Sequence, residues 1–221
     1  MAGSFPPRSP RLASAGLVVL DAVSGAVQRI ITLQYNPDSV SRSLQAKAAA
    51  GDTSDAGEAL RLGGAPTETI SLEAELDVTD QLEHPDENTT EVALGLLPRL
   101  AALESLLYPP AAQVQANDAL ARAGTVEILP IPGPLVVFVW SPERVLPVRL
   151  TELSIVEEAF DTNLRPIRAK VSLSLRVLSV DDLPLGTRGG SIAMTHHLAV
   201  EKLVANAPRG AFEDLGIGGV P

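Results

Sequence analysis

The stretch FDTNLRPIRA (residues 160–169) is the turn between two runs in which apolar and polar residues alternate. An extended chain converts such a period of two into one dry and one wet face. The run after the turn therefore predicts a strand with one face in water. Its apolar positions are Ile167, Ala169, Val171, Leu173, Leu175 and Val177.

The two runs match each other when they are folded about Asn163. Cross-strand pairs of apolar or oppositely charged side chains stabilise a sheet, and a slip of one residue would turn the apolar set to solvent. We therefore predict a long antiparallel hairpin with a specified register. The predicted pairs are Leu153 with Leu173, Ile155 with Val171, and Glu158 with Arg168.

Other segments also have strand patterns. The apolar parity changes between even and odd positions at Thr151 and Glu152, which predicts a bulge or bend there. Residues 17–20 and 27–35 flank a Gly-containing turn and predict a hairpin. Further predicted strands are 67–78, which alternates and should be half exposed, 125–131, and the continuous apolar run 135–140, which should be buried on both faces.

Leucines at steps of three and four residues predict a helix over 90–107, with Asn88 as its cap. Pro98 interrupts this pattern, so the helix either kinks there or begins there as a second segment. A second helix is predicted over 192–204, and 111–124 is ambiguous. Residues 47–66 are mostly small and polar, which predicts a mobile loop.

The composition limits the possible partners. The 27 acidic and 17 basic residues give a formal net charge of −10, which argues against nucleic acid and against anionic membranes. The absence of cysteine excludes disulfides and thiolate chemistry. No apolar run reaches the roughly 18 residues of a membrane span, and 1–12 lack the apolar core of a secretory signal, so we expect a cytoplasmic protein.

One acidic segment could hold a divalent cation in principle. Its residues lack the order of a calcium-binding loop, and Pro85 stiffens its middle. A solvated loop at a helix N-terminus, where the helix dipole favours negative charge, is the more ordinary interpretation. The candidate ligands are Asp77, Asp80, Glu83, His84, Asp86 and Glu87.

No other motif indicates catalysis. His196 and His197 have no further ligand at helical spacing, so they predict a surface or interface pair rather than a zinc site. There is no Gly-x-Ser-x-Gly elbow and no phosphate-binding glycine loop. We predict no catalytic, cofactor-binding or metal-binding residue, and hence no enzyme. Trp140 precedes a turn and is expected to be either a core anchor or an interface residue.

Several short motifs follow one another in a specific order: YNP (35–37), LDVT (76–79), PP (109–110), PLVVFVW (134–140), FD (160–161) and PIRA (166–169). This order resembles the N-terminal domain of the tube and baseplate adaptor proteins of contractile injection systems, which are phage-tail-like particles. The family usually has Phe-Asn-Pro and Trp-Gly where this chain has Tyr35 and Ser141. Many members carry a peptidoglycan-binding LysM module. The residues after Val180 do not show the sequence pattern of such a module.

The resemblance implies a mainly β fold, a barrel or split barrel like that of phage-tail tube proteins, with one or two helices packed on it. We assign this domain to 14–182, after a flexible arm (1–13) and before a C-terminal extension (183–221) with a short helix and a tail. The resemblance also implies a homo-oligomer, a ring of six subunits, that joins a VgrG-like spike protein to the tube and baseplate. The residues that it favours for the assembly interface are Tyr35, Asn36, Pro37, Trp140, Phe160, Asp161, Pro166 and Arg168.

Two other classes of function stay open beside this structural adaptor. A soluble β-barrel or sandwich could bind a carbohydrate or small ligand, although such a site needs an aromatic platform and only 3% of the residues are aromatic. A metal-dependent hydrolase would use the acidic segment 77–87 and would lose activity on Asp80→Ala or Glu83→Ala. The sequence favours the adaptor.

Overall fold

The computed structural model describes residues 14–47, 61–124 and 133–220. The predicted arm at 1–13 and the predicted strand at 125–131 lie outside the described residues. The greater part of the predicted loop 47–66 also lies outside them. Its described ends are tied down, because the Gly63 N–H donates to the Lys47 carbonyl (2.8 Å) and the Ala65 N–H donates to the Asp181 carboxylate (3.1 Å).

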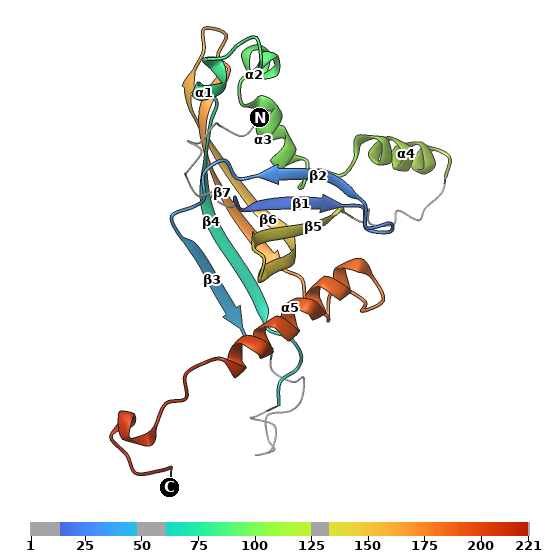
Figure 1. The fold of residues 1–221 in the computed structure, drawn as a ribbon. Helices are drawn as coiled ribbons and strands as arrows, with labels where there is room; N and C mark the ends of the chain where they lie inside the picture. The colour runs from blue at the N-terminus through green and yellow to red at the C-terminus, as the bar shows by residue number, and fades with distance from the viewer. Residues whose placement is uncertain (1–13, 48–60, 125–132, 221) are drawn as a thin grey trace.

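The described strands form one antiparallel sheet in the order β2-β1-β5-β6-β7-β4-β3 (Figure 1). The predicted hairpin at the N-terminus and the half-exposed strand before the acidic segment are confirmed as β1–β2 and β4. The strands are β1 (Gly16–Leu20), β2 (Val27–Thr32), β3 (Val40–Gln45), β4 (Thr67–Asp77), β5 (Leu135–Ser141), β6 (Arg144–Phe160) and β7 (Pro166–Val177).

The sheet is open, so the predicted barrel is wrong. β2 and β3 are its two edges and do not pair with each other. The inside of a barrel needs an apolar side chain at every second position of each strand. Arg29 interrupts this pattern in β2, and Arg42 stands between Val40 and Leu44 in β3. Neither edge strand therefore has the apolar face that closure would bury.

The long hairpin of β6 and β7 has the predicted register. Its pairs include Leu153 with Leu173, Ile155 with Val171, and Glu158 with Arg168. The predicted bulge is confirmed, because the register shifts between Leu150 and Glu152. Beyond this point β6 no longer pairs with β5, and its last residues pair with β7 alone.

The sheet folds over its own core. Figure 1 shows β2, β1 and β5 running across the direction of β4 and β7. Leu17 and Phe138 from the first set of strands are buried in the same cluster as Ile70 and Leu173 from the second. The main apolar core is therefore enclosed without closure of the sheet, and a second, smaller cluster is formed by Leu20, Leu135 and Val137.

Five α-helices and one 3-10 helix occur in the described ranges, and two of them, α3 and α5, contain fully buried residues. The expectation of a mainly β fold with one or two helices is therefore too low, because the described chain is mixed α/β with about three substantial helices, α3, α4 and α5. None of the described helices is long and apolar enough to cross a membrane. The helices are α1 (Thr79–Leu82), α2 (Thr89–Leu94), α3 (Leu97–Glu104), α4 (Ala111–Arg122), α5 (Arg188–Ala205) and the 3-10 helix η1 (Phe212–Leu215).

The single helix predicted over 90–107 is in fact two helices. Gly95 separates α2 from α3 with φ +59° and ψ −136°, a conformation that glycine adopts far more readily than other residues. Pro98 lies in the first turn of α3, where proline is tolerated, so the alternative of a second segment is confirmed. Asn88 stands at the N-cap, but its side chain donates to the His84 carbonyl (2.9 Å) instead of capping α2.

The helix predicted over 192–204 forms and begins earlier, as α5. Thr187 caps it, because its hydroxyl oxygen accepts the Gly190 N–H (3.1 Å). Gly189, Gly190 and Ala193 are buried, whereas the second half of α5 is largely exposed. The sequence 111–124, which the residue pattern leaves ambiguous, forms α4.

Candidate assembly surface

The tip of the β6–β7 hairpin is built around Asp161. Its Oδ1 accepts the backbone N–H groups of Arg165 (2.9 Å) and Asn163 (2.7 Å). These bonds, that of Arg165 first, favour the charged carboxylate and lower the pKa of Asp161. Leu164 has a left-handed φ of +60° and is 82% exposed at the tip. Asp161 thus fixes the turn, and Leu164 is the residue that the turn presents.

The hairpin tip packs on the junction of α2 and α3. Pro166 is buried, and its carbonyl accepts the Leu96 N–H (2.9 Å). The Arg165 guanidinium donates to the Val92 carbonyl (3.3 Å). A Cβ on Gly95 would lie 2.6 Å from the Pro166 oxygen, so this close approach requires glycine. Pro166, a predicted interface residue, is therefore used within the chain, and Gly95 is a key residue that the sequence interpretation missed.

Arg168 also has its partner within the chain, and this is not the predicted one. Its Nε lies 2.8 Å from Asp77 Oδ2, across β7 and β4. Glu158 lies opposite Arg168 in β6 as predicted, but its carboxylate contacts Lys170 (3.3 Å). Two strands flank β7, and the sequence pattern identified one of them only.

Asp77 connects the hairpin to the YNP segment. Its backbone N–H donates to Gln34 Oε1 (3.0 Å), which also accepts a hydrogen bond from Arg99 (3.1 Å). Next in the chain, Asn36 Oδ1 accepts the Ala15 N–H (3.0 Å) and ties the end of β2 to the start of β1. Tyr35 and Asn36 are exposed beside this network and Pro37 is partly buried.

Trp140 lies in β5, where it is partly buried and packs against the main core. Its ring centroid is 6.1 Å from that of Phe138, in a tilted arrangement. This supports the role of core anchor at a strand end. Because the ring is only partly buried, a role of Trp140 in an interface stays a prediction.

The structure does not bring three or more of the candidate ligands in the acidic segment 77–87 together as a group. In the described part of the chain no three His, Asp or Glu side chains are close enough to hold an ion. Asp77 is bound instead by Arg168 and by the Thr79 N–H (2.7 Å), and α1 follows it. The segment is a turn that leads into short helices.

The charge of Asp77 is expected to stabilise the fold in a pH-dependent way. Partial burial acts to raise the pKa of Asp77, but hydrogen bonds from Thr79 and Arg168 outweigh it and lower the pKa. A carboxyl with a lowered pKa stabilises the folded state above the unfolded value of about 3.9, and this contribution disappears as the pH falls below it. Asp77→Asn should reduce the free energy of unfolding by about 1 kcal/mol at pH 7 and by less at pH 3.

Urea denaturation at a series of pH values would measure this difference. Asp118→Asn is the matched control, because Asp118 pairs with Arg122 (2.8 Å) on the exposed face of α4 and should change stability little at any pH. An effect of Asp77→Asn that is the same at pH 3 and pH 7 would contradict a role of the charge.

The two adjacent histidines do not act as a pair. His196 is partly buried, and burial lowers its pKa; its Nδ1 has no hydrogen-bond partner in the described part of the chain. His197 is exposed, with Nε2 3.6 Å from Glu201 Oε1 on the same helix. The expectation of a surface pair therefore holds for His197 alone.

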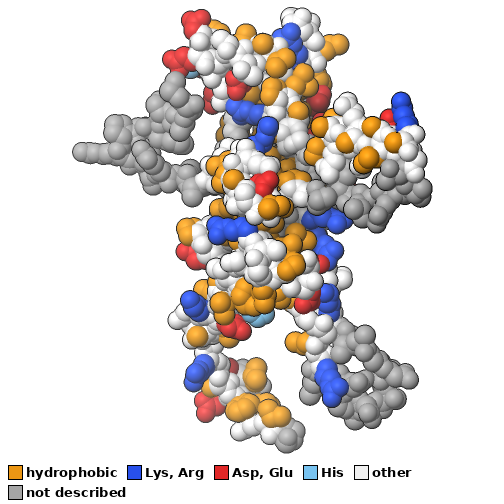
Figure 2. Space-filling view, turned by 90° about the vertical axis from the view of Figure 1, so that its right-hand side faces the viewer, with side chains coloured by type: hydrophobic (Ala, Val, Ile, Leu, Met, Phe, Trp, Pro, Cys, Tyr) orange, Lys and Arg blue, Asp and Glu red, His pale blue; other side chains and the backbone are white. Residues whose placement is uncertain are grey.

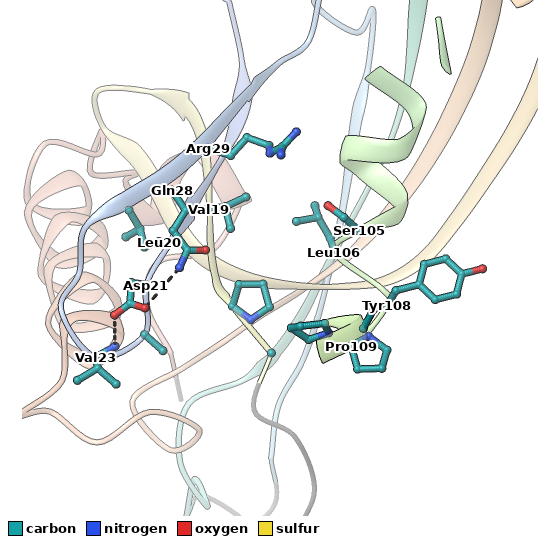
Figure 3. Close-up of a pocket in the computed structure, with 15 residues that line it drawn as sticks. Val19, Leu20, Asp21, Val23, Gln28, Arg29, Ser105, Leu106, Tyr108 and Pro109 are labelled. Atoms are coloured by element: carbon teal, nitrogen blue, oxygen red, sulfur yellow. Dashed lines mark hydrogen bonds between the residues drawn. The ribbon is translucent and has the colours of Figure 1, made fainter. Parts of the chain in front are cut away.

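A groove of about 640 Å³ lies between the β1–β2 hairpin and the end of α3 (Figure 3). Asp21 is the one carboxylate among its described lining residues, and its Oδ1 accepts the N–H groups of Val23 (3.1 Å) and Ser24 (2.7 Å). One aromatic residue, Tyr108, lines the groove. An adjoining groove of about 600 Å³ shares four lining residues with it and continues to Thr187 and Gly189 at the start of α5. The shared residues are Ala22, Leu106, Gly133 and Pro134.

Both edges of the sheet are accessible. Ile30 in β2 is 62% exposed and Leu44 in β3 is 53% exposed. An edge strand presents unpaired N–H and C=O groups to which another chain can add a strand. Figure 2 shows hydrophobic side chains scattered over the face of the molecule that it presents.

Comparison with known proteins does not assign a family. No protein-family model matches this sequence, and no curated protein matches it. Among solved structures, a chain of the virion of a native gene transfer agent (GTA) particle aligns with 74% of this chain and 95% of its own length. The sequence identity is 11% and the TM-score is 0.23, and a TM-score this low carries no argument about fold or function.

Proposed function

We propose that this chain is a structural subunit of a phage-tail-like particle and that it joins the spike to the tube and baseplate without catalysing a reaction. The open sheet carries the proposal. Among the described residues, β2 and β3 each pair with a strand on one side only, and each displays a large apolar side chain, Ile30 or Leu44, that is more than half exposed. Edges of this kind are normally blocked or covered in a protein that works alone. The order of the short sequence motifs, from YNP (35–37) to PIRA (166–169), is the reason for proposing a phage-tail-like particle.

The hairpin tip supports the same role. Asp161, Pro166 and Arg168 hold the tip on its own chain, while Phe160 and Leu164 remain exposed there. The tip is therefore a fixed projection with apolar contact residues. The groove supports it too, because Asp21 accepts hydrogen bonds from its own turn and Arg29 is the other charged residue among the described lining residues.

The proposal is tested by incorporation into particles. A tagged chain, expressed in cells that assemble the particles, should co-sediment with them. Ile30→Lys should leave the fold intact, since the side chain is exposed, yet it should exclude the chain from particles because lysine on an edge opposes strand addition. Val114→Lys, on the exposed face of α4, is the matched control and should be incorporated.

Circular dichroism and the urea midpoint would verify that both variants are folded. Absence of the wild-type chain from intact particles would refute the proposal. Equal incorporation of Ile30→Lys and the wild type would refute the role of the β2 edge.

A further inference from the structure

The residues after α5 form an arm, here defined as 206–220, in which every residue is exposed. Figure 1 shows the arm leaving the lower end of the molecule and pointing away from the sheet. Its large apolar residues are Phe212, Leu215, Ile217 and Val220. In the described part of the chain these four side chains are between 46% and 76% exposed, and apolar residues gathered on a projecting segment are typical of a surface that binds a partner.

The end of α5 continues this apolar surface. Leu203 and Val204 are 59% and 67% exposed, just before the arm begins. The first turns of the same helix are buried against the body through Gly189 and Gly190. The helix thus holds the arm away from the body.

The chain also contains an apolar receptor surface, the two joined grooves described above. Leu106, Leu107 and Leu183 line them together with Tyr108 and Pro109. In Figure 3, Tyr108 and Pro109 stand on one side and Val19 and Leu20 on the other. Phe212 and Leu215 have the size and character to fill such a groove.

The grooves have an excess of basic side chains and the arm has an excess of acidic ones, although Asp21 also lines the grooves and Arg209 also lies in the arm. Arg29 and Arg149 line the grooves, and neither has an ion pair with another described residue. Glu213 lies next to Phe212 in the arm, followed by Asp214, which also accepts the Ala211 N–H (2.9 Å). In a chain of net charge −10, two unpaired arginines beside an apolar groove favour an acidic apolar segment as the occupant.

The arm is poorly placed to fill the groove of its own copy. Thr187 and Gly189 line the groove at the first turn of α5, whereas the arm leaves from the last turn. The 18 residues of α5 span about 27 Å. The seven residues from Ala205 to Phe212 reach at most about 25 Å when fully extended. An arm folded back along its own helix does not bring Phe212 to that end.

We propose that the arm of one copy docks in the groove of a second copy, with Phe212 and Leu215 in the apolar part and Glu213 beside Arg29 or Arg149. The contact rests on the proposed assembly role, because it requires copies of this chain to meet. It is heterologous, since each copy donates an arm at one end and receives an arm at the other. Such contacts generate rings or filaments.

Cysteine cross-linking tests the contact, because the natural chain has no cysteine to interfere. Two full-length variants with different tags, Leu215→Cys and Tyr108→Cys, are mixed and oxidised. A disulfide forms only where the two Cα atoms come within about 7 Å. We expect a covalent heterodimer that carries both tags. The control replaces Tyr108→Cys by Val114→Cys on α4, which is also exposed (47%, against 71% for Tyr108) but does not line the grooves and should give no heterodimer.

A second variant tests the same contact without cross-links. Phe212→Ser together with Leu215→Ser should leave the fold unchanged and weaken self-association, measured by analytical ultracentrifugation, by about tenfold or more. Failure of the mixed Leu215→Cys and Tyr108→Cys variants to form a heterodimer would overturn the proposal. Self-association of the double-serine variant equal to that of the wild type would overturn it as well.

The two proposals fail in different ways. If the cysteine variants cross-link arm to groove but the wild-type chain never enters particles, the arm contact stands and the proposed particle role is refuted. If the chain enters particles but the cysteine variants form no cross-link, the particle role stands and the arm contact is refuted.

Discussion

Phe138→Ala is expected to reduce the free energy of unfolding by about 3–5 kcal/mol, the range for removal of a buried aromatic side chain. Phe138 is 1% exposed and lies in β5. It pairs with Leu17 of β1 on one side and with Leu146 of β6 on the other. Its loss leaves a cavity at the place where the two sets of strands share a core. Urea denaturation followed by far-UV circular dichroism would measure the change.

Phe160→Ala is the matched control, because it is the same substitution on a side chain that is 49% exposed at the end of β6. We expect it to cost less than about 1 kcal/mol. A similar loss of stability in the two variants would show that Phe138 is not the centre of the core. The control also informs the assembly proposal, since a folded Phe160→Ala chain can be assayed for particle incorporation.

The β6–β7 hairpin shows what the sequence is able to predict. Leu153, Ile155 and Glu158 each have a chemically matched partner at one register, and any slip would expose leucines and bury arginines. The bulge after Leu150 follows from the same pattern, because an extra residue is required to change the apolar parity. Local periodicity therefore determined a long-range pairing.

The prediction of a barrel was wrong because closure depends on the two edge strands, and the sequences of these strands do not indicate whether they pair. β2 and β3 are short and have no clean alternation, and the resemblance to tube proteins supplied the closure that their residues do not. The partner of Arg168 was missed for a related reason. β7 lies between β6 and β4, and a period of two does not reveal which neighbour supplies the opposite charge.

The grooves were beyond the reach of sequence interpretation. Their walls come from the β1–β2 hairpin, the end of α3, β5 and the start of α5, which are far apart in the chain. The exposed arm leaves a weak signal in the sequence, since Phe212, Leu215 and Ile217 are apolar residues in a Gly-containing segment without a strand or helix pattern. What these residues contact is decided by tertiary and quaternary structure.

Gly95→Ala is expected to reduce the free energy of unfolding by about 2–6 kcal/mol. Two effects add, and the first is the backbone, because φ +59° with ψ −136° costs a residue with a Cβ about 1–3 kcal/mol. The second is the contact, because the new Cβ would lie 2.6 Å from the Pro166 oxygen, which accepts the Leu96 N–H (2.9 Å). Displacing that carbonyl leaves a buried donor without its partner, at about 1–3 kcal/mol.

Gly124→Ala separates the two effects. Gly124 also has a positive φ, +82°, but a Cβ there would meet nothing within 4 Å. It should therefore show a backbone cost of at most about 1–2 kcal/mol and no contact term. If Gly95→Ala reduces the free energy of unfolding by no more than Gly124→Ala does, the close approach of Pro166 to α2 and α3 is not needed for stability. A larger loss at Gly95, measured by urea denaturation, would identify this junction as the support of the hairpin tip, and hence of the projection that Phe160 and Leu164 present.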